Sequence, residues 1–433
     1  MATEESQPVS LPKGRLAENI IWLTSLQALN YLLPMATVPY LIRVLGATNY
    51  GVMAFAVTFT QYLVLLTDYG FNLSATRQVA LVRNDRNKLE ESVSAVLVIK
   101  AALLIVSVLI MAVVLAVPSR YSQYGTVMAI AFLSVVGTVL FPTWLFQGLQ
   151  DMRVVTLLST VGRLVCTSAI FLTVRSRQDV ALATLWTVSA IPISGVTAWF
   201  VIRRRYKLAL GLPSRQALQT ALASGFHVFL SSAMGGVLIN GAVLVLSLMT
   251  PMHVVGVYAA IERIAKAAVM MFAPLTQALY PRTVEHFHTS YAEGKRFVMR
   301  TGAMVVGLAA AVSLILVALA RPVILLICGS AFVPYAPVLR VLAVWLFIGV
   351  LNNILGIQYL LASGRYRVYS TCFTAAALTT FVLLFVLVRK YSYMGAAVSV
   401  TVGEILLTLL MIIVALKSQE SPEEFELSRE GAV

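Results

Sequence analysis

Lys and Arg occur at five places inside long apolar stretches of the sequence, where a charge needs a specific reason to be present. An ionisable group at the depth of a bilayer is costly, and it commonly marks a polar pathway or an ion pair. Cations lining such a pathway attract anionic groups of a substrate. The five candidates for a substrate pathway are Lys100, Arg163, Arg263, Lys266 and Arg340.

The position of each cation within its stretch distinguishes these candidates. Lys100 and Arg340 lie near the ends of their stretches, where a long side chain reaches water by snorkelling, so a structural role is favoured for both. Arg163 lies near the middle of its stretch, where snorkelling is harder. We therefore expect Arg163 to face a cavity, with a buried ion pair as the alternative.

A short charged group occurs in the stretch near residues 254–280. Glu262 and Lys266 are four residues apart, one turn along the same helix face, so they can form an ion pair. Arg263 projects about 100° around the helix axis from Glu262, so it is a candidate to face a cavity inside the protein. The alternative is an internal ion pair that neutralises the helix.

Three carboxyl groups are candidates for ion coupling. Glu404 lies near the middle of an apolar stretch without a basic neighbour on its own helix, so it could exchange a proton or pair with a cation of another helix. Asp68 ends a stretch and is followed by Arg77, which favours capping or pairing at the loop over coupling. Glu262 is the third candidate.

Neither a catalytic constellation nor a metal or cofactor site is predicted. None of the four histidines has a zinc-like spacing with Cys, Asp or Glu, and the three cysteines are isolated from one another. Phosphate-binding GxxxxGK[ST] and GxGxxG sequences are absent, which argues against direct coupling to ATP. The sequence therefore predicts a protein that is not an enzyme.

The elements that position these residues are membrane-spanning helices. Of 433 residues, 59% are hydrophobic and 12% are charged, against roughly 45–50% and about 25% in soluble proteins. The first apolar run, from Asn19 to Leu45, is too long for the apolar part of a signal peptide. A span needs about 20 apolar residues. We predict twelve spans, near 18–42, 50–70, 95–117, 125–147, 153–174, 180–202, 224–249, 254–280, 301–321, 335–362, 367–388 and 394–416.

The distribution of Lys and Arg predicts the orientation. With both termini in the cytoplasm, the cytoplasmic segments hold roughly three times as many basic residues as the opposite side. The net charge of +14 is then explained by this bias and by contact with anionic lipid head groups, without a nucleic acid partner.

Two halves of six spans each are predicted, with a boundary in the basic loop at 203–223. We place the halves at residues 1–207 and 208–433. The run that starts at Gly51 recurs at Gly256, and Arg77 recurs as Arg282 at the same offset. This weak repeat joins spans of like orientation, so it indicates parallel repeats.

The segment from Asn30 to Arg77 resembles the N-terminal signature of the bacterial oligosaccharide repeat-unit flippases, the Wzx-type O-antigen transporters. The strong match covers about 60 residues, and a second matching run extends from Phe141 to Gly148. The residues that carry the match are Asn30-Tyr31, Pro34, Pro39-Tyr40, Arg43-Val44-Leu45-Gly46, Tyr50-Gly51 and the run from Leu66 to Arg77.

The resemblance implies an all-α fold of the multidrug/oligosaccharidyl-lipid/polysaccharide exporter superfamily, with two six-helix bundles around a V-shaped cavity. It implies a flippase of the bacterial inner membrane that moves polyprenyl-pyrophosphate-linked oligosaccharides from the cytoplasmic to the periplasmic leaflet. A polysaccharide polymerase and a chain-length regulator are the partners expected from it. Arg163 would then bind the pyrophosphate or an acidic sugar, while Asn30 and Gln61 would contact glycan hydroxyls or form interhelical hydrogen bonds.

Two other functions remain open at this point. A multidrug extruder of the same superfamily needs an acidic site for cationic drugs, and five intramembrane cations argue against it. A polysaccharide polymerase or glycosyltransferase commonly carries a large periplasmic loop, whereas every predicted outer loop is short.

Overall fold

The structure is a computed structural model that describes residues 13–116 and 121–417, and helices make up most of this part of the chain. No strand occurs within these residues. In a bilayer the backbone has no water to bond to, so a long apolar segment satisfies its amide and carbonyl groups within its own helix. The predicted all-α membrane fold is confirmed.

The first half of the chain forms eight α-helices, and a short 3₁₀ turn at Ser122–Tyr124 precedes the fourth. A π-helical turn, Ile202–Tyr206, follows the last of them. The helices are α1 (Lys13–Asp68), α2 (Phe71–Val82), α3 (Arg86–Ala116), α4 (Gly125–Ala131), α5 (Leu133–Leu140), α6 (Thr143–Gly148), α7 (Met152–Thr173) and α8 (Val180–Val201).

The second half begins with a long helix, α9 (Arg215–Met249). A 3₁₀ turn at Ser330–Tyr335 precedes α14, and the π-helical segment η4 (Ile354–Leu361) follows it directly. The other helices are α10 (Met252–Met270), α11 (Ala273–Thr289), α12 (Tyr291–Ala318), α13 (Ala320–Ile327), α14 (Ala336–Asn353) and α15 (Tyr366–Lys417).

Eight stretches among the described residues are long and apolar enough to cross a membrane, and a ninth is the bent helix α9. Two of the eight are 47 and 49 residues long. A straight helix of that length would measure about 70 Å, more than twice the roughly 30 Å of hydrocarbon. α1 and α15 instead break at Gly46 and Ser392, where φ is positive. The count of twelve spans stays a prediction.

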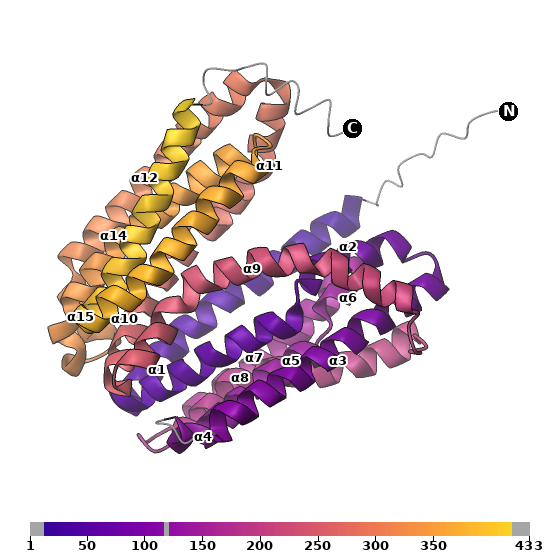
Figure 1. Ribbon diagram of the computed structural model, residues 1–433, viewed down its shortest axis with the longest axis horizontal. Coiled ribbons are helices and arrows are strands. Elements are labelled where there is room, and N and C mark those ends of the chain that lie inside the picture. Colours follow the sequence, from indigo (N-terminus) through magenta and orange to yellow (C-terminus); the bar gives the residue numbers. More distant parts are fainter. Residues whose placement is uncertain (1–12, 117–120, 418–433) are drawn as a thin grey trace.

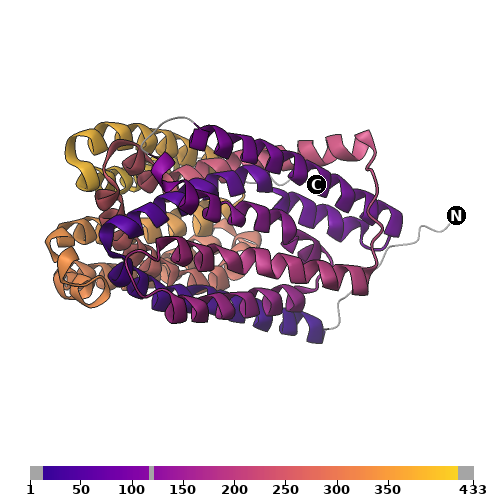
Figure 2. The ribbon, with the colours of Figure 1, turned by 90° about the horizontal axis from the view of Figure 1, so that it is seen from below.

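Two helix bundles meet at one end and diverge towards the other (Figure 1). The first bundle contains α1–α8 and the second contains α10–α15. Seen from below, the axes of the long helices of both bundles are roughly parallel to one another (Figure 2). α1 starts and α15 ends at the end where the bundles diverge, which we call the open end.

α9 connects the bundles and bends by 59° between Gly236 and Ile239. It packs against α2 and α3 of the first bundle and against α15 of the second. Its early part packs against Gly70, which follows the end of α1. The contact is close, since a Cβ atom added at Gly70 would clash with Val228 and Phe229 of α9. The boundary at 207/208 stays a prediction, since α9 contacts both bundles.

The bundles join where α1 crosses α10, at the end opposite the open one. A Cβ atom on Gly51 would lie 2.0 Å from the carbonyl oxygen of Met252, and one on Gly256 would lie 1.7 Å from that of Ala47. Only glycine permits this approach of two helix backbones. Gly51 and Gly256 are the two glycines that head the repeated run in the sequence. We call this the closed end.

Candidate functional site

A cavity of about 520 Å³ lies in the first bundle. All eight helices of the first bundle except α4 contribute to its wall, together with Gly236 and Asn240 of α9. It contains Lys100, Arg163, Asp68 and Gln61, which are four of the predicted site residues. The cavity therefore gathers charged residues that are far apart in the sequence.

Arg163 is the cation of this cavity that has no partner among the described residues. It lies on α7 and is partly buried. Its guanidinium forms neither a hydrogen bond nor an ion pair with any described residue. The adjacent Gly162 lets α7 approach α8, because a Cβ there would lie 2.7 Å from the Ser194 Oγ. Close packing on one side of α7 thus fixes Arg163 in the cavity wall.

Lys100 does not snorkel to water, contrary to the expectation from its place in the sequence. Its side chain is 1% exposed, and its Nζ is 2.9 Å from Oδ1 of Asp68. Asp68 likewise pairs with this lysine of α3 within the bundle, instead of with a group in the loop. Removing one member of a buried pair leaves an uncompensated charge, which typically costs about 3–5 kcal/mol.

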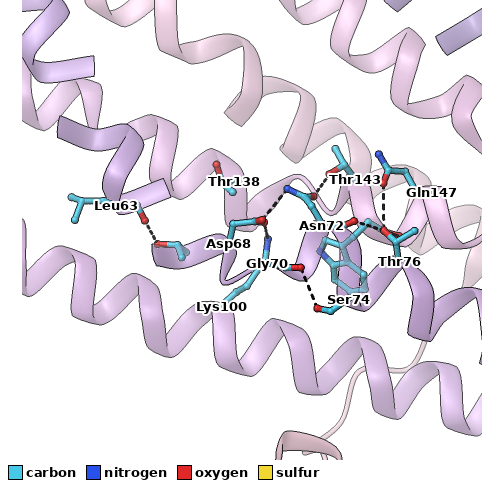
Figure 3. A network of polar contacts seen from close by, with 12 residues as sticks. Leu63, Asp68, Gly70, Asn72, Ser74, Thr76, Lys100, Thr138, Thr143 and Gln147 are labelled. Atoms are coloured by element: carbon cyan, nitrogen blue, oxygen red, sulfur yellow. Dashed lines mark hydrogen bonds and ion pairs between the residues drawn. The ribbon is translucent and has the colours of Figure 1, made fainter. Parts of the chain in front are cut away.

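A hydrogen-bond network extends from this ion pair to α2 and α6 (Figure 3). Asn72 Nδ2 donates to Asp68 Oδ2 over 3.0 Å, and the Thr143 hydroxyl donates to Asn72 Oδ1 over 3.0 Å. The Thr76 hydroxyl lies 3.3 Å from Gln147 Oε1 and donates to it. The two sequence runs that carry the family resemblance therefore meet in one wall of the cavity.

A backbone break between α1 and α2 gives this wall its shape. Tyr69 and Gly70 both have positive φ, at 49° and 75°. Such a conformation is unfavourable for a tyrosine and persists only where its surroundings hold it. The ring of Tyr69 stacks on Phe229 of α9 with centroids 5.2 Å apart, which supplies that support.

Asn72, Thr143 and Gln147 are site residues that the analysis of charges missed. All three line the cavity. Each of the three lies in a sequence run that carries the family resemblance. A neutral polar residue in such a run does not, however, indicate which residue it contacts in the fold. Only the fold brings α2 and α6 together.

The predicted ion pair on α10 is present. Lys266 Nζ is 3.1 Å from Glu262 Oε2, and it also donates to the carbonyl oxygen of Ile239 on α9. Arg263 is exposed and points towards Tyr50 at the crossing of α1 and α10. Neither Arg263 nor Lys266 lines the first-bundle cavity, so the structure separates them from Arg163.

Glu404 of α15 has an amide as its partner and no ion pair within the described residues. Asn352 Nδ2 donates to Glu404 Oε2 over 2.5 Å, and Thr408 donates to Asn352 Oδ1 over 2.6 Å. This cluster lies in the second bundle, away from the first-bundle cavity.

The remaining predicted residues lie elsewhere. Arg340 is exposed near the start of α14, and its snorkelling stays a prediction. The side chain of Asn30 lies outside the described part of the structure. No group of three metal-ligating side chains occurs among the described residues.

Comparisons with known proteins identify the family to which the chain belongs. The chain matches the family model described as "Polysaccharide biosynthesis protein" over residues 16–287. A protein of Escherichia coli (strain K12) named "Putative O-antigen transporter" is 29% identical over 400 residues, which are 92% of this chain and 96% of the relative. A protein of Shigella dysenteriae with the same name is 25% identical, with 92% and 99% covered.

Solved structures share the fold at low sequence identity. The lipid II flippase MurJ in an inward closed conformation has a TM-score of 0.72 at 12% identity, covering 92% of this chain and 87% of its own. A MATE family multidrug transporter in an inward-facing conformation has a TM-score of 0.68 at 13% identity, covering 93% and 96%. At such identities the likeness shows the fold alone.

Proposed function

Because the chain belongs to the polysaccharide biosynthesis protein family, we propose that it is a flippase that moves lipid-linked oligosaccharide units across the bacterial inner membrane. The substrate is an oligosaccharide linked through a diphosphate to a polyprenyl chain, and it moves from the cytoplasmic to the periplasmic leaflet. The names of the two relatives and the flippase MurJ support this proposal. Membership of the family confirms the resemblance seen at residues 30–77.

The observation that carries the proposal is the guanidinium of Arg163, which lines the first-bundle cavity and has no partner among the described residues. A diphosphate offers several anionic oxygens to a planar guanidinium, which binds such groups in a bidentate manner. The neighbouring Lys100 is neutralised by Asp68, so Arg163 supplies the cavity's uncompensated positive charge among the described residues. The polar groups of Gln61 and Asn240 are placed to meet sugar hydroxyls.

Transport then proceeds by alternating access of the cavity to the two faces. In our proposal both termini are cytoplasmic, so the open end faces the cytoplasm and the Gly51–Gly256 crossing closes the periplasmic side. The polyprenyl tail stays in the bilayer while the head group crosses between the bundles. A polysaccharide polymerase and its chain-length regulator would use the unit delivered to the periplasm.

Loss of the gene tests this function in cells. We expect the lipid-linked unit to accumulate on the cytoplasmic leaflet and the surface polysaccharide to disappear, since a charged glycan does not cross hydrocarbon unaided. Surface polysaccharide is measured by gel staining, and the lipid-linked unit by mass spectrometry of extracted lipid. A plasmid copy of the gene should restore the surface polysaccharide and remove the accumulated lipid-linked unit. Unchanged surface polysaccharide in the deletion strain would contradict the proposal.

Glu404 is our candidate for coupling transport to a proton gradient. Its carboxyl pays a desolvation cost when ionised in the second bundle, and no cation offsets that cost within the described residues. Opening of the bundle to water would lower the cost, which links protonation to the direction of opening. We expect Glu404→Gln to slow export and to remove its dependence on an imposed pH gradient, while Glu404→Asp retains part of both.

Vesicles with a pH gradient provide the measurement for this coupling. The Gln side chain also accepts a hydrogen bond from Asn352, so loss of fold is not expected to obscure the result. Thr379→Ala is a matched control, because Thr379 is an exposed residue on the same helix. Equal gradient-driven rates in the wild type and Glu404→Gln would exclude the coupling role.

A further inference from the structure

A second cavity, of about 460 Å³, lies in the second bundle, and the proposed function does not yet use it. Residues of α10, α11, α14 and the π-helical segment η4 form its wall. None of its lining residues is Lys, Arg, Asp or Glu. The cavity differs in this respect from the first-bundle cavity, whose wall holds Arg163, Lys100 and Asp68.

The polar groups in this wall are amides and hydroxyls beside aromatic rings. Gln277, Asn353 and Gln358 supply amides, and Thr276 and Tyr280 supply hydroxyls. Phe272 and Tyr280 supply ring faces. Amides both donate and accept hydrogen bonds, as hydroxyl groups do, and aromatic rings cover the apolar faces of other rings.

The oxygen atom of one of these amides has no hydrogen-bond partner among the described residues. The Oδ1 atom of Asn353 is buried and accepts no hydrogen bond from any described residue. Gln358, in contrast, is satisfied at both ends: its Nε2 donates to the Thr276 carbonyl over 2.7 Å, and its Oε1 accepts from Thr283 over 3.1 Å. Buried polar groups in native proteins are nearly always paired, so an unpaired amide oxygen on a residue that lines a cavity points to a ligand.

The backbone is distorted where it presents this amide. α14 changes at Ile354 into a π-helix of eight residues. In an ordinary α-helix, Asn353 and Gln358 would lie about 140° apart around the axis. The wider π-helical turn brings both onto the cavity side, where they line the same wall. π-helical segments are rare and frequently mark functional sites.

We propose that this second-bundle cavity binds an uncharged sugar unit of the glycan, with the Asn353 carboxamide bonded to its hydroxyl groups. The inference rests on the proposed function, because it assigns the diphosphate end of the same substrate to the Arg163 cavity. An apolar lipid chain in this place would leave Asn353 unpaired, and an anionic group would find no cation in the cavity wall.

The two cavities lie on either side of the contact between α9 and α10. Asn240 of α9 lines the first cavity, and its neighbour Ile239 accepts a hydrogen bond from Lys266. Val269, one helical turn after Lys266, lines the second cavity. The inference requires a glycan that extends from its diphosphate past this contact to the second cavity.

The test compares two probe lipids on the full chain in nanodiscs. One probe is a polyprenyl diphosphate without sugar, and the other is the same lipid carrying a neutral tetrasaccharide. Asn353→Leu removes the amide at similar volume and is expected to weaken binding of the glycan-bearing lipid by about tenfold, because sugar hydroxyls lose their partner. It should leave the affinity for the sugar-free lipid unchanged. Gln219→Ala, which removes an exposed amide outside both cavities, should change neither affinity.

Three results would overturn this inference, and they separate it from the proposed function. If Asn353→Leu binds the glycan-bearing lipid as the wild type does, the amide is not a sugar ligand. If it weakens both lipids equally, the residue acts on the fold and not on the sugar. If the wild type binds neither lipid, the proposed function fails and this inference fails with it. Asn353→Ala repeats the comparison in case Leu fits poorly.

Discussion

Arg163→Ala is expected to reduce transport of the lipid-linked unit by at least about tenfold while the protein remains at normal abundance in the membrane. A hydrogen bond between charged groups contributes about 1.5–3 kcal/mol, and each 1.4 kcal/mol corresponds to about tenfold. Arg163 has no protein partner within the described residues, so its removal leaves no buried carboxylate unpaired. Surface polysaccharide and immunoblots of membranes measure the two quantities.

Two further substitutions give this prediction its controls. Arg163→Lys retains a cation without the bidentate geometry, so we expect partial activity. Lys100→Ala should instead lower the amount of folded protein, because it leaves Asp68 buried without its ion-pair partner. Normal transport by Arg163→Ala would remove the main support for the cavity as a diphosphate site. Loss of that variant from the membrane would assign Arg163 to the fold.

Gly51→Ala and Gly256→Ala are expected to abolish transport by preventing the closed end from closing. Each added methyl group would meet a backbone carbonyl oxygen of the other helix at 2.0 Å or less, and backbone atoms cannot rotate away. The bundles must then separate at this end, which in the proposed orientation favours the state open to the periplasm. A protein held in that state cannot load its substrate from the cytoplasm.

Accessibility of the closed end measures this effect. In the wild type Val257 is 1% exposed, so a cysteine at that position on a cysteine-free background should resist labelling from outside. Gly51→Ala should make it reactive. Gly307→Ala is the matched control, because no atom lies within 4 Å of a Cβ added at this helical glycine. Unaltered labelling and transport in Gly51→Ala would show that the crossing adapts and is not a gate.

The sequence predicted those features of the fold and site that depend on local spacing. The pair of Glu262 and Lys266 follows from helix periodicity alone, and the structure contains it. Apolar length alone predicted an all-helical membrane fold, while the count of twelve spans stays a prediction. The expectation that Arg163 faces a cavity followed from its position in the middle of a predicted span, and Arg163 lines the first-bundle cavity.

Contacts between distant segments were beyond such reasoning. Lys100 and Asp68 are 32 residues apart on different helices, and nothing in their spacing shows that they pair. The repeat headed by Gly51 and Gly256 was visible, yet only the fold shows that the two glycines touch. The π-helical turn after Asn353 leaves no mark in the apolar pattern, so the second cavity was not predicted.

Translocation by the purified protein is the most direct test of the central claim. Vesicles would contain the protein and a lipid-linked oligosaccharide, with a glycan-cleaving enzyme added only outside. The enzyme reaches only the outer leaflet. Cleavage of more than the outer-leaflet share of the lipid therefore reports movement from the inner leaflet. We predict that wild-type vesicles proceed to nearly complete cleavage and that vesicles without protein stop near one half, while vesicles with Arg163→Ala pass one half at least about tenfold more slowly than the wild type. Cleavage that stops near one half with the folded wild type, with or without an imposed ion gradient, would contradict the claim that this chain is a flippase.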